Sequence, residues 1–213
     1  MARHLHAAGG PLVGKGLCGK KLKDAYGNGI YSITVGDLVR ARRQKDLAFE
    51  KRYGELIDDG FLVPDEEINP MVVHHYEMGT GLGHELFYWD GWNRNPHQVA
   101  TAKKLGVLDP KNSMVAILKA SRCVCYDRLL HRRGLKPNGD RPDDKVDEVF
   151  NRRWNIFATH FRSVRKALAQ ERVPILKIDA RQDLGIVTEL MLEGAQKLRP
   201  VCREQGLLVG VPV

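Results

Sequence analysis

Five short segments of strand length alternate along this chain with longer segments in which apolar residues recur at helical intervals. They predict strands at residues 3–8, within 27–37 after a turn, and at 84–92, 113–120 and 173–180. The first of them, RHLHAA, is more polar than a buried parallel strand usually is. Alternating strands and helices favour a mostly parallel sheet covered on both faces. We therefore predict an α/β fold, a three-layer sandwich around a five-stranded, mostly parallel sheet.

The longer segments predict the helices of the outer layers. Helical patterns are expected at 17–26, 36–56, 123–133, about 145–170 and 183–198, and DDGFLVPDE marks a break before a further helix start. A Gly/Pro/Asp-rich loop is expected at 134–144. The length of 213 residues suits one domain with a sizeable core, so a single domain over 1–213 is predicted.

Composition and charge limit the classes of function. The formal net charge is +8 and 43% of the residues are hydrophobic, which is typical of a soluble globular protein with anionic partners. No apolar run approaches the roughly 20 residues of a membrane helix, so no membrane partner is expected. The four cysteines form no CxxC pair, so a zinc site is not expected. Free thiols, and a first strand that leaves no room for a signal or transit peptide, predict a cytoplasmic or other soluble location (a cilium, flagellum or mitochondrion included) and not secretion.

A glycine-rich segment, GGPLVGKGL at 9–17, follows the first predicted strand and precedes the first predicted helix. Glycines let such a loop turn its N–H groups towards phosphate at a helix N-terminus, and Lys15 would reach the β- and γ-phosphates. Leu17 stands where these loops carry a hydroxyl for Mg²⁺. The expected ATP phosphate-binding residues are Gly9, Gly10, Gly14, Lys15, Gly16 and Leu17. The alternative is a glycine-rich turn with a surface lysine.

Two polar segments at predicted strand ends are further site candidates. In WDGWNRNPHQ, Asp90 ends a buried strand and could orient metal-bound water, with Arg94 and Gln98 at the next intervals of four. In TVGDLVRARR, Arg40 could hold a second phosphate. Ligands bind at the carboxyl ends of parallel strands, so Asp90 and the glycine loop should converge. The alternatives are an ordinary polar loop and a helix cap.

Six arginines flank the predicted Gly/Pro/Asp loop: Arg128, Arg132, Arg133, Arg141, Arg152 and Arg153. Phosphoryl transfer needs fixed cations around the migrating group, which such a set could supply. The alternative is a solvated basic surface that docks on RNA or on an acidic protein.

Taken in order, these segments resemble the adenylate kinase family of nucleoside monophosphate kinases over almost the whole chain. GGPLVGKGL resembles the family's GGPGSGKGT, TVGDLVR resembles STGDLLR, and GFLVPDE resembles G-x-LVPDE. DGWNRNPHQ resembles DGFPRxxxQ, the helix ending in RLLHRR resembles RLLxR, and GDRPDD resembles the SGRxDD of the short-lid subfamily. The resemblance implies a P-loop fold with a core at 1–35, 67–131 and 143–213, a helical monophosphate-binding region at 36–66 and a short lid at 132–142.

The resemblance also implies a reaction, the transfer of the γ-phosphoryl group of ATP to AMP with Mg²⁺. Lys15 would stabilise the transferred group, and Asp90 would order the metal through water. The implied monophosphate-binding residues are Val35, Arg40, Arg94 and Gln98. Of these, Gln98 favours adenine, whereas Val35, together with Asn95, resembles the pyrimidine-specific relatives. The implied catalytic arginines are Arg128, Arg132, Arg141 and one of Arg152 and Arg153.

Several small or hydroxyl residues of the family pattern are replaced: Leu12 for Gly, Leu17 and Val35 for Thr, and Asn93 for Pro. Two hypotheses follow. The retained charged residues favour a working phosphotransferase. The replacements favour a catalytically weak or inactive relative that docks on a large axonemal or ribonucleoprotein assembly through its basic surface.

Overall fold

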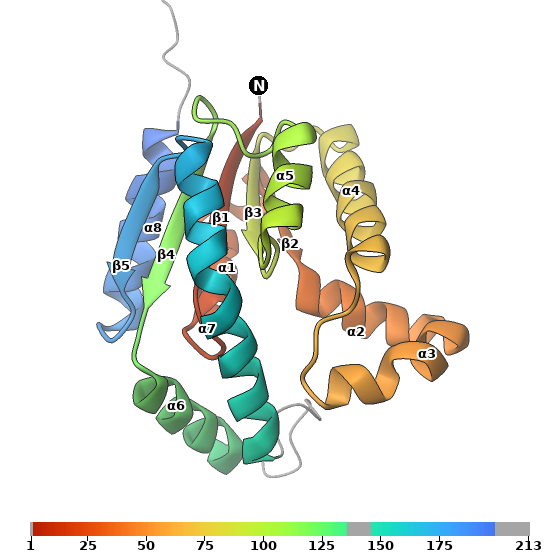
Figure 1. Ribbon diagram of the computed structural model, residues 1–213. Helices are drawn as coiled ribbons and strands as arrows, with labels where there is room; N and C mark the ends of the chain where they lie inside the picture. The colour runs from red at the N-terminus through yellow and green to blue at the C-terminus, as the bar shows by residue number, and fades with distance from the viewer. Residues whose placement is uncertain (1, 136–145, 199–213) are drawn as a thin grey trace, which may run out of the picture.

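The computed structural model describes residues 2–135 and 146–198, and a five-stranded sheet forms its centre (Figure 1). The strands are β1 (Arg3–Ala8), β2 (Ile30–Thr34), β3 (Leu86–Asp90), β4 (Ser113–Lys119) and β5 (Ile175–Asp179). They pair in the order β2-β3-β1-β4-β5, and every pair is parallel. The predicted five-stranded parallel sheet is confirmed, with β1 at its centre.

Helices cover both faces of this sheet, so the predicted three layers are confirmed. The helices are α1 (Lys15–Tyr26), α2 (Val35–Lys45), α3 (Leu47–Asp58), α4 (Asp65–Gly81), α5 (Pro96–Lys104), α6 (Arg122–Leu135), α7 (Asp147–Gln170) and α8 (Leu184–Lys197), with a 3₁₀ turn η1 (Gly27–Gly29). In Figure 1, α5 and α7 lie in front of the sheet, α1 and α8 lie behind it, and α2 and α3 project to one side. The projecting helices fall mostly within the region 36–66.

Side chains that alternate along β3 point into two separate cores. Phe87 and Trp89 pack with apolar residues of α4, α5 and α7, whereas Leu86 and Tyr88 pack with those of α1 and α8. All five residues of β3 are buried. Burial on both faces explains why this strand reads as a continuous apolar run in the sequence.

The central strand β1 forms despite its two histidines. His4 and His6 are 1% and 2% exposed. The Trp89 indole N–H donates to His4 Nδ1 at 3.3 Å, and His6 Nε2 lies 2.6 Å from the carbonyl oxygen of Val107. Burial lowers the pKa of His4 to about 3 and that of His6 to about 4. Both rings are therefore neutral at pH 7, and each has a hydrogen-bond partner that makes its burial tolerable.

The single helix predicted over 36–56 is wrong, because the chain forms two helices that meet at Asp46. The Asp46 carboxylate caps α3 by accepting a hydrogen bond from the Phe49 N–H at 2.9 Å. Arg43 of α2 pairs with Asp58 at the end of α3, 2.6 Å away, and this contact ties the two helices together. The apolar period continues across the break, so periodicity alone did not reveal it.

Part of the predicted lid lies outside the described residues. Residues 136–145 fall in this gap, and the predicted site residue Arg141 falls there with them. In the ranges 2–135 and 146–198, no helix combines the length and the apolar character needed to cross a membrane.

Candidate functional site

The glycine-rich loop joins the carboxyl end of β1 to the first turn of α1. Gly9 has φ +145° and Gly14 has φ +106°, conformations that favour glycine. A Cβ on Gly9 would also lie 2.6 Å from the carbonyl oxygen of Leu118 in β4. Leu12 has φ +60°, which costs a residue with a side chain on the order of 1 kcal/mol. The loop therefore keeps the shape that its glycines predict, at some local cost at Leu12.

The Lys15 side chain folds back over this loop. Its Nζ donates to the carbonyl oxygens of Gly9 at 3.0 Å and Gly10 at 2.8 Å. Burial lowers the pKa of Lys15 to about 8, and the nearby Asp90 carboxylate opposes that shift. Lys15 is thus mostly protonated at pH 7. The Tyr88 hydroxyl donates to the Lys15 carbonyl oxygen at 2.7 Å and so anchors the start of α1 on β3.

Asp90 and the start of α1 converge, as the ends of parallel strands should. Asp90 is the last residue of β3 and stands in register with Ala7 of β1. It is 7% exposed, and its Oδ2 lies 3.7 Å from the position that a Cβ on Gly16 would take. Leu17, next along α1, is 57% exposed and offers no oxygen to a metal. One buried carboxylate therefore lies beside the phosphate loop.

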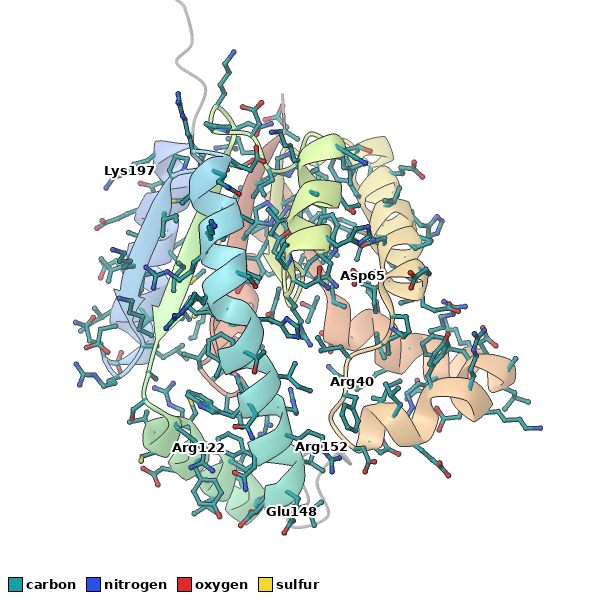
Figure 2. The ribbon with its side chains drawn as sticks, in the orientation of Figure 1. Arg40, Asp65, Arg122, Glu148, Arg152 and Lys197 are labelled. Carbon is teal, nitrogen blue, oxygen red and sulfur yellow. The ribbon has the colours of Figure 1, made fainter. Side chains whose placement is uncertain are left out.

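A cavity of about 210 Å³ lies between the loop, α2, the segment after β3, and α7. Its walls include apolar residues such as Val39, Ile68 and Phe157. Figure 2 labels Arg40 and Arg152, which lie on α2 and α7, the helices on either side of it. The predicted site residues that line the cavity are Gly9, Lys15, Val35, Arg40, Arg94, Gln98 and Arg153.

Of the two adjacent arginines on α7, Arg153 lines this cavity and Arg152 does not. Arg152 donates to the carbonyl oxygen of Asp59 at 2.6 Å, and its guanidinium lies 4.7 Å from the centre of the Phe61 ring. The sequence left open which of the two faces the site. The geometry assigns Arg153 to the cavity and Arg152 to the segment that follows α3.

Arg128 and Arg132 lie on α6, away from the cavity. Arg128 donates to the carbonyl oxygen of Val13, at 3.1 Å, and to that of Ala180 just after β5. It therefore braces the phosphate loop from outside. Arg133, beside Arg132, pairs with Asp147 at the start of α7, 2.6 Å away.

Gln98 is 3% exposed, and both ends of its amide are engaged within the protein. Its Nε2 donates to Asp65 Oδ1 at 2.7 Å, and its Oε1 accepts from the Arg94 N–H at 2.8 Å. Asp65, at the start of α4, also accepts from Asn95 at 3.1 Å and lies 2.9 Å from His97 Nδ1. Gln98 thus links the Arg94 turn to α4 (Figure 2 labels Asp65).

No role was predicted from the sequence for Asp65, His97 or Arg43, although Arg43 lines the cavity. Arg43 pairs with Glu50 and Asp58, and those carboxylates raise its pKa. The segment GFLVPDE pointed to Asp65 only as part of a resemblance. Its partners are about 30 residues away, so no local pattern shows the contact.

Of the three cysteines in the described residues, Cys18 and Cys125 are buried and Cys123 is exposed. Cys18 is buried, and burial raises its pKa to about 11. Burial also raises the pKa of Cys125. Within 2–135 and 146–198, no three His, Cys, Asp or Glu residues gather into a group that could hold a metal ion.

A glycine-rich loop at the end of the central parallel strand, with a lysine that lines a cavity together with several arginines, is typical of α/β proteins with the P-loop kinase fold. No protein-family model matches the chain. The adenylate kinase of Micrococcus luteus is 30% identical over 195 residues, which are 90% of this chain and 89% of that protein. The chain belongs to the adenylate kinase family.

Two further relatives agree with this assignment. The adenylate kinase of Thermosynechococcus vestitus is 28% identical over 151 residues, 70% of this chain and 75% of its own. The adenylate kinase of Kosmotoga olearia is 26% identical over 215 residues, 89% of this chain and 97% of its own. The predicted family is confirmed, and it supports a function like that of a nucleoside monophosphate kinase.

Proposed function

We propose that this chain transfers the γ-phosphoryl group of ATP to AMP with Mg²⁺. The observation that carries the proposal is that Lys15, Arg40, Arg94 and Arg153 all line one cavity. Four cations from the loop, α2, the β3–α5 turn and α7 surround a space next to the phosphate loop. Phosphoryl transfer is accelerated mainly by positioning and by fixed positive charge, which such an arrangement supplies.

Each cation has a role in this proposal. Lys15 stabilises the transferred phosphoryl group, because it already lies across the loop that would cradle the triphosphate. Arg40 and Arg94 hold the monophosphate, and Arg153 contacts the transferred group from α7. Arg128 supports the loop through its bond to the Val13 carbonyl. The roles of Arg132 and Arg141, on the predicted lid, rest on the resemblance alone.

The residues present fit a Mg²⁺ ion that arrives with the nucleotide. Mg²⁺ usually takes one or two protein carboxylates and completes its shell with phosphate oxygens and water. Asp90, buried beside the first turn of α1, supplies one such carboxylate. When bound, Mg²⁺ neutralises charge on the phosphates. We assign Asp90 to order it through water.

The proposal divides the chain as the resemblance does, into a core, a monophosphate-binding region at 36–66 and a short lid at 132–142. In the reaction implied by the resemblance, closure of these two regions would exclude water, which otherwise takes the phosphoryl group from ATP.

The nature of the acceptor is tested by initial rates with ATP and each of AMP, CMP, UMP and GMP. AMP is expected to give the highest kcat/KM. Gln98 supports adenine, but its amide is engaged with Asp65 and Arg94, so a base contact requires that it exchange one of these bonds. A higher kcat/KM for CMP or UMP would overturn the assignment of AMP.

The two α7 arginines give a matched pair of variants. Arg153→Ala is expected to lower kcat by about 10²-fold or more, because it removes a fixed cation from the reacting centre. Arg152→Ala is expected to stay within about threefold of wild type, because its ion pair with Asp59 is partly exposed. Steady-state rates of both variants check this. Equal losses, or a larger loss for Arg152→Ala, would contradict the placement of Arg153 at the reacting group.

Leu17 offers a direct test of the altered loop. Leu17→Thr introduces a hydroxyl in the first turn of α1, at the residue after Gly16, and is expected to lower, several-fold, the Mg²⁺ concentration that gives half the maximal rate. Leu17→Val is the matched control, since valine has the shape of threonine without the hydroxyl. The same Mg²⁺ dependence in both variants would show that the hydroxyl contributes nothing.

A wild-type chain that binds no ATP and forms no ADP would instead favour the second hypothesis, a non-catalytic relative held in a larger assembly.

A further inference from the structure

The turn that carries Arg94 contains a residue in an unusual backbone conformation. Asn93 has φ +62° and is 6% exposed. Few residues other than glycine adopt a positive φ, and asparagine is among those that do so most readily. The turn also bends at Gly91, with φ +80°, and Arg94 Nη2 lies 2.8 Å from the place that a Cβ on Gly91 would take. The conformation of this turn therefore determines where the Arg94 guanidinium lies.

Hydrogen bonds tie the turn to three neighbouring elements. The Trp92 indole donates to Asn69 of α4 at 3.2 Å, and the Arg94 N–H donates to Gln98 of α5. The third joins the turn to the central strand, because Asn93 Nδ2 lies 3.0 Å from His6 Nδ1. Both side chains of this third bond are buried.

The second contact of His6 fixes the direction of this bond. His6 Nε2 lies 2.6 Å from the Val107 carbonyl oxygen, which can only accept, so the ring proton is on Nε2. Nδ1 is then unprotonated and accepts from the Asn93 amide. The Trp89 ring stacks on the His6 ring with a centroid distance of 5.4 Å and an interplanar angle of 10°, which limits rotation of the imidazole. A neutral ring with one tautomer thus connects Val107, β1 and the turn.

We propose that His6 and Asn93 form a buried pair that sets the turn presenting Arg94 to the monophosphate, so that His6 is a positioning residue for that site. The inference rests on the proposed function for the role of Arg94. It unites two features that the sequence shows as unrelated departures, a polar first strand and an asparagine at position 93. Proline, which stands at this point of the family pattern, has φ fixed near −65° and could not adopt the turn seen here.

The pair is tested with His6→Leu, Asn93→Gly and the double variant. Glycine keeps the positive φ and removes only the side-chain bond. Each single variant is expected to raise KM for AMP about tenfold and to leave KM for ATP within about twofold. The reason is that a displaced Arg94 guanidinium would weaken the binding of the monophosphate and not that of ATP. The double variant should be no worse than the poorer single one, because both remove the same bond. The inference would be overturned if the increases in KM for AMP multiplied in the double variant, or if KM for AMP and KM for ATP rose equally.

His4→Leu is the matched control for burial of a histidine on the same strand. His4 contacts Trp89 and not the turn, so its loss is expected to change stability without a selective rise in KM for AMP. A selective rise in this control would also overturn the inference.

Two readouts separate this inference from the proposed function. Nitrogen-15 NMR of the wild-type chain should show His6 protonated on Nε2 only; protonation on Nδ1 would overturn the pair even if every variant failed to fold. The effects of His6→Leu and Asn93→Gly on the free energy of unfolding should be non-additive in the double variant, whether or not a nucleotide is present. A wild-type chain that neither binds AMP in calorimetry nor forms ADP would overturn the proposed function and the role of the turn. Non-additive unfolding would in that case still support the His6–Asn93 pair.

Discussion

Replacing Lys15 with methionine is expected to lower the rate of ADP formation by about 10³-fold or more. The reason is electrostatic: the Lys15 ammonium lies over the phosphate loop, bonded to the Gly9 and Gly10 carbonyl oxygens. In the proposed reaction this ammonium would stabilise the phosphoryl group during its transfer. Methionine has a similar length but neither a charge nor an N–H, so the variant loses the ammonium and its two hydrogen bonds to the loop. Rates of ADP formation from ATP and AMP measure the loss.

Lys20→Met is the matched control on the same helix. Lys20 is exposed on α1, so this change removes an equal charge without touching the loop and should leave the rate near that of the wild type. Circular dichroism melting of both variants establishes that each is folded. Unchanged turnover in Lys15→Met, or an equal loss of turnover in both variants, would contradict the role assigned to Lys15.

Acidification is expected to destabilise the fold strongly through the two histidines of β1. The folded-state pKa is lowered from 6.5 to about 3 at His4 and to about 4 at His6. Below pH 6.5 the unfolded chain binds a proton on each ring while the folded chain does not, so stability falls as pH falls. Between pH 7 and pH 5 the free energy of unfolding should fall by about 4 kcal/mol, about 2 from each histidine. Above pH 6.5 this stability is fully present.

Urea denaturation at several pH values measures this effect. Most carboxylates do not titrate above pH 5, so the histidines dominate the window. The variant His4→Gln/His6→Gln has no titrating ring at these positions and should show a much flatter profile. If that variant does not fold, NMR titration of the wild-type imidazoles answers the same question. Rings that protonate with a midpoint near pH 6.5 in the folded chain would contradict the account.

The fold could be predicted from the sequence because its evidence is local. Alternating strand and helix patterns, such as SMVAILKA at 113–120 followed by a helical segment, determine the parallel sheet without any knowledge of distant contacts. The break at Asp46 was missed because the apolar period of α2 continues into α3. There the decisive signal is a cap, the bond from the Phe49 N–H to Asp46.

The site was predictable in part, for a related reason. Lys15, Arg40, Arg94 and Gln98 lie in short motifs, and all four line one cavity. The choice between adjacent arginines on α7 depends on helix phase relative to a segment about 90 residues away, which the sequence does not contain. The partners of His6 are equally remote: Trp89, Asn93 and Val107 meet it only once the sheet has formed. For this reason His4 and His6 look unfavourable in a central strand when only the sequence is considered, and their burial is explained once their partners are known.

The most direct measurement uses ATP labelled at its γ-phosphate, incubated with AMP, Mg²⁺ and the purified chain, with products separated by chromatography. The account predicts that the label moves from ATP into ADP, as transfer to the AMP phosphate requires, and that little appears as inorganic phosphate. Label that stays in ATP, or that appears only in inorganic phosphate, would contradict the claim that this cavity joins two nucleotides for phosphoryl transfer.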